Sequence, residues 1–199
     1  MAAYRTRRIF PIALVLIIVA VAIVGLVYAT QFLFFSGNNN SVPKADAGQT
    51  ALLNTSANHS VVMHVRGQIV ADENFRSYQI KIAPNGRTFT SYKGYLNQQI
   101  ENVSIYNNVQ AYEQFVYALD RLKFMNSNEL TGDSNDTRGV CATGYLYEFQ
   151  VMDSNKTVKK LWTTSCSGSS GSLRANVSSI MYLFVVQIPD IQTKISQLW

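Results

Sequence analysis

Residues 141–166 read CATGYLYEFQVMDSNKTVKKLWTTSC, the stretch with the clearest structural pattern in the chain. In its first half apolar and polar side chains alternate, as they do in a half-buried β-strand. One face of that strand carries Tyr145, Tyr147, Phe149 and Val151. Residues 153–156 (DSNK) are typical of a turn, and Thr157–Ser165 follows as a returning strand. The stretch therefore predicts an antiparallel hairpin.

Two cysteines, Cys141 and Cys166, stand at the ends of this hairpin. With the turn centred near residues 153–154, they fall nearly opposite each other across the two strands. In an oxidising compartment such a pair is expected to form a disulfide. Closing a loop of 24 intervening residues would stabilise the fold by roughly 3 kcal/mol in the chain-entropy model. Two free buried thiols, or one reactive cysteine, are the alternatives.

More strands are predicted upstream of this hairpin. Residues 61–70 are apolar and β-branched, residues 75–83 alternate, and residues 88–96 and 100–106 follow as further strands. Asn85-Gly86 favours a two-residue hairpin turn in which both central residues take positive φ. These strands and the later hairpin predict one antiparallel sheet.

Helical periodicity appears in three places. From residue 108 to 124 apolar side chains recur every three or four positions with charges between them, which indicates an amphipathic helix. Residues 173–187 form a strongly apolar helix that we expect to be buried on the sheet, and residues 191–198 form a short last helix. The order of elements predicts an α+β domain, an antiparallel sheet with helices packed on it.

The N-terminal part has a different character. No charged residue occurs from residue 9 to 35, and a helix over this segment is long enough to cross a bilayer. Arg5, Arg7 and Arg8 precede it, so the positive-inside rule places residues 1–8 in the cytoplasm and the rest of the chain outside. The lipid bilayer is therefore the expected partner of this N-terminal helix. A cleaved signal peptide is the alternative, with Val27-Tyr28-Ala29 as its cleavage site.

Residues 36–60 are rich in Asn, Ser, Ala and Thr and predict a flexible stalk, followed by an extracytoplasmic α+β domain over residues 61–199. The formal net charge of +5 owes much to the three N-terminal arginines. Without them 14 basic residues stand against 12 acidic ones. With no basic stripe left, the sequence argues against a nucleic-acid partner.

The sequence carries no motif for a cofactor or a metal, so we expect neither. His59 and His64 are the only histidines, and Glu129, Asp133 and Asp136 share a loop that is most simply solvated. Six Asn-x-Ser/Thr sequons are left undecided as glycan sites. They begin at Asn54, Asn58, Asn102, Asn135, Asn155 and Asn176.

An enzymatic alternative rests on Cys166. The run from Leu161 to Cys166, LWTTSC, with Arg174 downstream, resembles a sortase, which implies a transpeptidase with a Cys nucleophile, a His and an Arg. The chain departs from the sortase pattern, because the Thr-Leu-x-Thr-Cys run and the Gly-His pair are missing. A disulfide would also consume the nucleophile. An envelope-associated hydrolase is the related alternative.

The domain is similar to a group of uncharacterised, membrane-anchored bacterial envelope proteins with a strand–helix–hairpin–helix head. Residues 145–151, the turn after them, and residues 161–166 with the Ser/Gly loop behind them carry this likeness. The resemblance implies a fold and no chemistry. We expect a single-pass protein of the plasma membrane with a non-catalytic binding or structural role in the envelope. Its partner would be another envelope or cell-surface protein, or a glycan.

Overall fold

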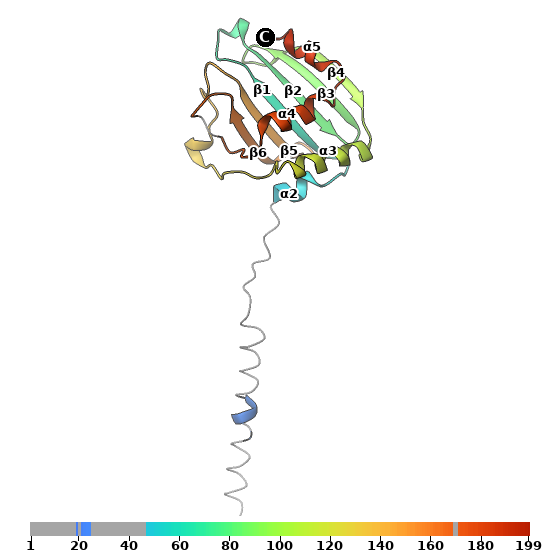
Figure 1. Ribbon diagram of the computed structural model, residues 1–199, viewed down its shortest axis with the longest axis vertical. Coiled ribbons are helices and arrows are strands. Elements are labelled where there is room, and N and C mark those ends of the chain that lie inside the picture. The colour runs from blue at the N-terminus through green and yellow to red at the C-terminus, as the bar shows by residue number, and fades with distance from the viewer. Residues whose placement is uncertain (1–18, 20, 25–46, 169–170) are drawn as a thin grey trace, which may run out of the picture. The chain divides into compact units, whose positions relative to one another are not determined.

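One antiparallel sheet of six strands organises the structure, which is a computed structural model (Figure 1). The strand order is β4-β3-β2-β1-β5-β6. The strands are β1 (His59–Arg66), β2 (Arg76–Ala83), β3 (Gly86–Lys93), β4 (Gln98–Tyr106), β5 (Leu146–Asp153) and β6 (Lys156–Thr164). The structure describes residues 19, 21–24, 47–168 and 171–199. The predicted α+β class with an antiparallel sheet is confirmed.

Four helices accompany the sheet, and Figure 1 shows α3, α4 and α5 in front of it. The helices are α2 (Ala47–Leu52), α3 (Val109–Arg121), α4 (Val177–Val185) and α5 (Ile191–Ser196), with short 3₁₀ turns η1 (Asp72–Asn74) and η2 (Gly132–Asn135). Asn108 begins α3 and Asn176 begins α4, because each amide oxygen accepts a hydrogen bond from a backbone N–H three residues on, at 2.9 Å.

The hydrophobic core lies between this helix layer and one face of the sheet. Phe149 on β5, Phe115 on α3 and Phe184 on α4 are buried there with their rings in contact. The face of β5 predicted from the alternation does belong to the core. Outside this core lies the other face of the sheet, whose central strands carry His64, Arg66, Gln79 and Glu148; we call it the polar face.

Both predicted hairpins form, but one turn differs from the expectation. Ala83 pairs with Gly86, so the β2–β3 loop is Pro84-Asn85, and neither Asn85 nor Gly86 has a positive φ. Proline fixes its own φ near −65°, which excludes a turn that needs a positive φ at that position. In the β5–β6 hairpin Asp153 pairs with Lys156, as the sequence predicts, and Ser154 takes a φ of 56°.

The predicted stalk over residues 36–60 is too long. Residues 47–52 form α2, whose Leu52 is fully buried against the core, and β1 begins at His59. The apolar period in this segment is too short to separate a single helical turn from a loop. Residues 36–46 lie outside the described residues.

The predicted span over residues 9–35 also lies outside the described residues, apart from residues 19 and 21–24. So does the tail with Arg5, Arg7 and Arg8. Within the described residues, no helix combines the length and the apolar character that a membrane crossing requires.

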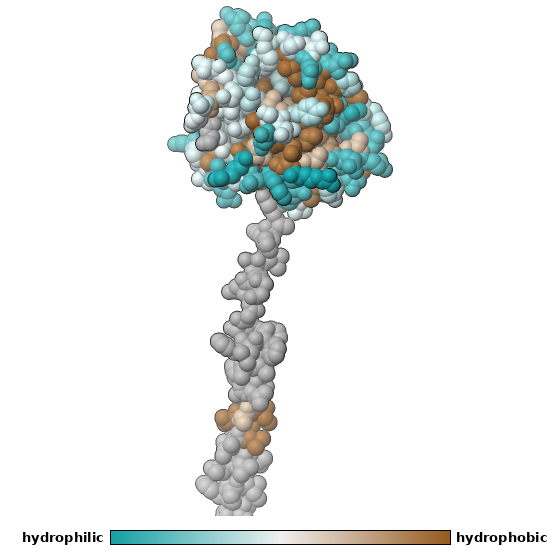
Figure 2. All heavy atoms as spheres, in the orientation of Figure 1, coloured by the Kyte–Doolittle hydropathy of each residue, from teal (hydrophilic) through white to brown (hydrophobic). Residues whose placement is uncertain are grey.

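The last apolar helix is shorter and less buried than expected. It covers residues 177–185 rather than 173–187, and only one side of it faces the sheet. Ile180 and Phe184 are buried, whereas Tyr182 is 62% exposed. Figure 2 shows apolar residues reaching the surface around α4.

Candidate functional site

The polar face holds a compact group of charged side chains, which we call the Glu148 cluster. Its members are His64, Arg66, Glu148 and Lys160. Strand pairing brings them together, because His64 on β1 stands directly opposite Glu148 on β5. Lys160 on β6 lies two residues along from Trp162, the residue paired with Glu148. Alternation along each strand points all four side chains to the same side of the sheet.

Glu148 lies at the base of the cluster, with a side chain only 8% exposed. Lys160 Nζ binds its Oε1 at 2.6 Å, and Arg66 Nε lies 3.1 Å from its Oε2. Thr137 links Arg66 to Glu148. Its hydroxyl accepts a hydrogen bond from Arg66 Nη2 at 3.0 Å and donates one to Glu148 Oε1 at 3.4 Å. Both carboxylate oxygens are therefore engaged by protein groups.

Burial and charge act in opposite directions on Glu148. Burial alone would raise its pKa, but the hydrogen bond from Lys160 and the charges of Arg66, Lys160 and His64 outweigh it and lower the pKa below its usual value. Glu148 is thus a carboxylate at neutral pH.

His64 has its pKa lowered, chiefly by burial, against the opposing pull of Glu148. Its Nδ1 lies 3.9 Å from Glu148 Oε2, and its Nε2 is buried with no hydrogen-bond partner in the described part of the chain. The imidazole is neutral at neutral pH, so the fixed charges of the cluster are two cations and one anion.

A hollow of 310 Å³ opens above the cluster. Beyond the four members of the cluster, its lining consists of Phe75, Tyr95, Asn97 and Thr137. A second hollow of 340 Å³ adjoins it and shares Arg66, Phe75, Tyr95 and Thr137. Together they form one depression at the end of the polar face.

Two loops build the walls of this depression. On one side Tyr95 stacks on Phe75 with ring centroids 4.1 Å apart, and its hydroxyl donates to the Val70 carbonyl at 2.7 Å. Asn97, which has a φ of 55°, ends the same β3–β4 loop. On the other side the loop before β5 supplies Thr137 and is anchored where Trp162 Nε1 donates to Asn135 Oδ1 at 2.9 Å.

The predicted disulfide is present. Cys141 and Cys166 are bonded, with Cα atoms 5.5 Å apart, just beyond the ends of β5 and β6. Ser165 Oγ accepts from the Tyr145 backbone N–H at 2.8 Å beside it. Since these are the chain's only cysteines, neither sulfur is a free thiol.

The loop with the predicted acidic residues does not gather them into a site. Asp136 pairs with Arg138, whose hydrogen bonds lower the pKa of that carboxyl to about 2. Among the described residues, no group of three His, Cys, Asp or Glu side chains is placed to hold a metal ion.

The sequon asparagines have mostly structural contacts. In the described part of the chain, Asn155 is exposed in the β5–β6 turn and its side chain has no hydrogen-bond partner. The other five use their side-chain amides in hydrogen bonds; they are Asn54, Asn58, Asn102, Asn135 and Asn176.

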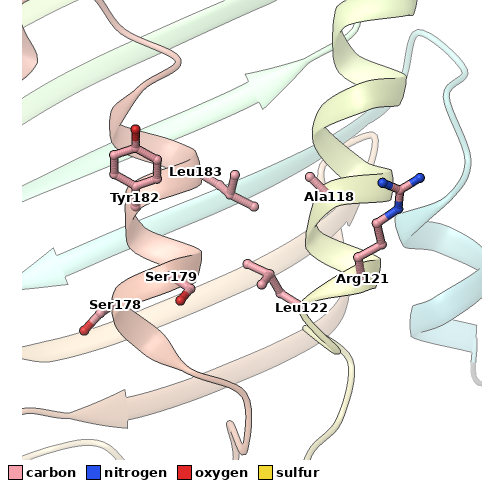
Figure 3. Close-up of a pocket in the computed structure, with 7 residues that line it drawn as sticks. All are labelled: Ala118, Arg121, Leu122, Ser178, Ser179, Tyr182 and Leu183. Atoms are coloured by element: carbon pink, nitrogen blue, oxygen red, sulfur yellow. The ribbon is translucent and has the colours of Figure 1, made fainter.

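A separate, apolar hollow of 500 Å³ lies on the opposite side of the domain, between α3 and α4 (Figure 3). Leu183 from α4 points toward Ala118 and Leu122 from α3 across this gap, and Arg121 points away from it. Ser178, Ser179 and Tyr182 complete the lining. It contains no arrangement of groups for chemistry.

Sequence reasoning identified the disulfide and missed the Glu148 cluster. The signal was present, because His64 and Arg66 are two residues apart on a strand, as expected for one face. What the sequence lacked was the pairing of β1 with β5, across some 80 residues of chain.

Comparison of the chain with protein-family models gives no matching family, and comparison with curated proteins gives no relative. The case for a function therefore rests on the residues themselves.

Proposed function

We propose that this chain is a membrane-anchored, extracytoplasmic binding module of the cell envelope, with a non-catalytic role. The observation that carries the binding role is the depression above the Glu148 cluster. It is open, it is lined by side chains with unused hydrogen-bond donors, and its one carboxylate is engaged by protein partners.

The proposed location rests on other residues than the proposed binding. The uncharged segment 9–35 after three arginines favours a single crossing with the N-terminus in the cytoplasm. A disulfide is typical of proteins that fold in an oxidising compartment, and Cys141–Cys166 supports the same placement. The transpeptidase alternative loses its support, because the Cys166 sulfur is held in that disulfide and is unavailable as a nucleophile.

Topology is tested with the full chain in its native membrane. Protease added to intact cells or spheroplasts is expected to digest residues 47–199, and alkaline carbonate is expected to leave the anchor in the membrane fraction. A domain that resists protease until the membrane is permeabilised would contradict the orientation. Release by carbonate would show that residues 9–35 do not anchor the chain.

Binding is tested by photo-crosslinking. A photoreactive amino acid replaces Asn97 at the edge of the depression, and a matched probe replaces Glu113, which is exposed on α3. An envelope adduct that forms from position 97 and not from position 113 would support the proposed function. Equal labelling at both positions, or none at position 97, would contradict it.

A further inference from the structure

We infer that the depression above the Glu148 cluster binds an oxyanion group, a carboxylate or a phosphate, through Arg66 and Lys160. The inference deepens the proposed function by naming the chemistry of the ligand, and it rests on that function. Its evidence is the arrangement of charge, exposure and unused donors around one carboxylate.

The exposed fractions put positive charge at the opening and negative charge beneath it. Side chains of Arg66 and Lys160 are 30% and 40% exposed, whereas Glu148 is 8% exposed. A ligand that enters the depression therefore meets two cations before it reaches the carboxylate. After one cation balances Glu148, a single positive charge remains unbalanced in the cluster.

The free hydrogen-bonding capacity of the two cations consists of donors alone. An ammonium has three N–H groups and a guanidinium has five. Lys160 Nζ uses one on Glu148, and among the described residues Arg66 donates a hydrogen bond only through Nη2, to Thr137, which leaves Nη1 free. The Asn97 amide, which carries both a donor and an acceptor, also lines the hollow with no partner among the described residues.

The one carboxylate of the depression, by contrast, is already used. Both oxygens of Glu148 contact Lys160, Arg66 or Thr137. A neutral sugar carries no charge, so it would leave the unbalanced positive charge of the cluster without a counter-ion. A carboxylate or phosphate only accepts, so it matches the free donors. Charged donors also give the stronger hydrogen bonds to such a group.

The test uses the full chain in micelles of an uncharged detergent, followed by NMR. Sodium phosphate and sodium acetate are titrated as the two oxyanion probes, and glucose is the neutral probe. We expect phosphate, acetate or both to shift the backbone amide signals of Tyr95, Asn97 and Thr137. Which of the two anions binds more tightly distinguishes a phosphate-bearing from a carboxylate-bearing ligand.

Lys160→Met is expected to weaken anion binding at least about tenfold. The matched control is Lys81→Met, because Lys81 is an exposed lysine of the same face outside the depression, and its replacement is expected to leave the affinity within about twofold. Glu148→Gln, which removes the negative charge below the site, is a second variant and is expected to strengthen binding. Unchanged signals in β1 and β5 verify that each variant is folded.

Several results would overturn the inference. Equal weakening by Lys160→Met and Lys81→Met would show a general effect of charge. Binding of glucose without either anion would leave the proposed binding module standing and exclude its oxyanion ligand. Absence of all three shifts, with no adduct from position 97 in the crosslinking test, would remove both the ligand class and the binding module.

Discussion

At the scale of single residues, Glu148 is the position where the fold and the candidate site depend on each other. Its carboxylate lies under the polar face with Arg66 and Lys160 as partners. Removal of the charge would leave two cations in a partly desolvated place without their counter-ion, which costs more than the loss of an exposed ion pair.

Glu148→Gln is therefore expected to lower the free energy of unfolding by about 1–3 kcal/mol, below the range for fully buried pairs because both cations reach solvent. Urea denaturation of the full chain in micelles, followed by far-ultraviolet circular dichroism, measures this. Glu113→Gln on the exposed side of α3 is the control, with an expected change within about 0.5 kcal/mol. Equal effects in the two variants would mean that the cluster adds no stability.

The lowered pKa values of His64 and Glu148 predict a loss of stability in acid. A group whose pKa is lower in the folded state binds protons more readily when the chain is unfolded, so the folded state loses stability as the pH falls. For His64 this loss begins near the ordinary histidine pKa of about 6.5. For Glu148 it begins near the ordinary carboxyl value and continues down to its lowered pKa.

His64→Gln is expected to flatten the decline in melting temperature between about pH 6.5 and pH 5, and to leave the steeper decline at lower pH in place. Melting curves across this range give the comparison with the unchanged chain. If the variant kept the full decline above pH 5, another group would be responsible for it.

At the scale of elements, the alternation in residues 145–151 and the period of residues 108–124 were enough to predict the β5–β6 hairpin and α3. These segments have strong apolar patterns and local partners, so their sequences determine their structures. The prediction of a turn at Asn85-Gly86 was wrong. The φ of Pro84 is fixed, and this constraint competed with the turn preference of Asn-Gly, so the turn forms at Pro84-Asn85. The Glu148 cluster could not be predicted in full, since it depends on which distant strands pair.

The helix α2 was missed because its six residues are held by tertiary contact rather than by propensity. Ala51 and Leu52 pack into the core, and Gln49 Nε2 donates to Asp120 Oδ1 at 2.5 Å. Gly48 lies so close to Met125 and Lys159 that a side chain there would displace them. The folded part of the chain therefore includes residues that resemble a linker in composition.

Leu52→Ala is expected to lower the free energy of unfolding by about 2–5 kcal/mol, because the side chain is fully buried and its removal leaves a cavity. Leu96→Ala makes the same substitution at a position that is 95% exposed, and the expected change is within about 0.5 kcal/mol. Urea denaturation compares the two. A small effect at Leu52 would restore the boundary of the domain to residue 61.

At the scale of the whole molecule, the disulfide closes the β5–β6 hairpin and fixes the end of the loop that leads into β5. It encloses 24 residues, on a sequence separation of 25. The same loop supplies Thr137 to the Glu148 cluster. Loss of the disulfide is therefore expected to lower the stability of the fold and to loosen the loop that carries Thr137.

The double variant Cys141→Ser, Cys166→Ser is expected to lose about 3 kcal/mol of stability, a fall in melting temperature of about 6–12 °C. Calorimetry of the full chain measures it, and reduction of the unchanged chain with dithiothreitol is expected to give the same fall. A titration of thiols in the unfolded, unreduced chain is expected to find none. One reactive thiol would contradict the disulfide in solution.

Trp199 bears on the order in which the domain folds during synthesis. The Trp199 ring lies over Gly67, where any side chain would collide with it, and its centroid is 5.1 Å from that of Tyr145. The central strand β1 likewise cannot pair with β5 until β5 has been synthesised, about 80 residues later. The contacts of β1 with β5 and of Gly67 with Trp199 therefore form only after most of the domain has been synthesised. A fusion placed after Trp199 must therefore leave its ring free to reach Gly67.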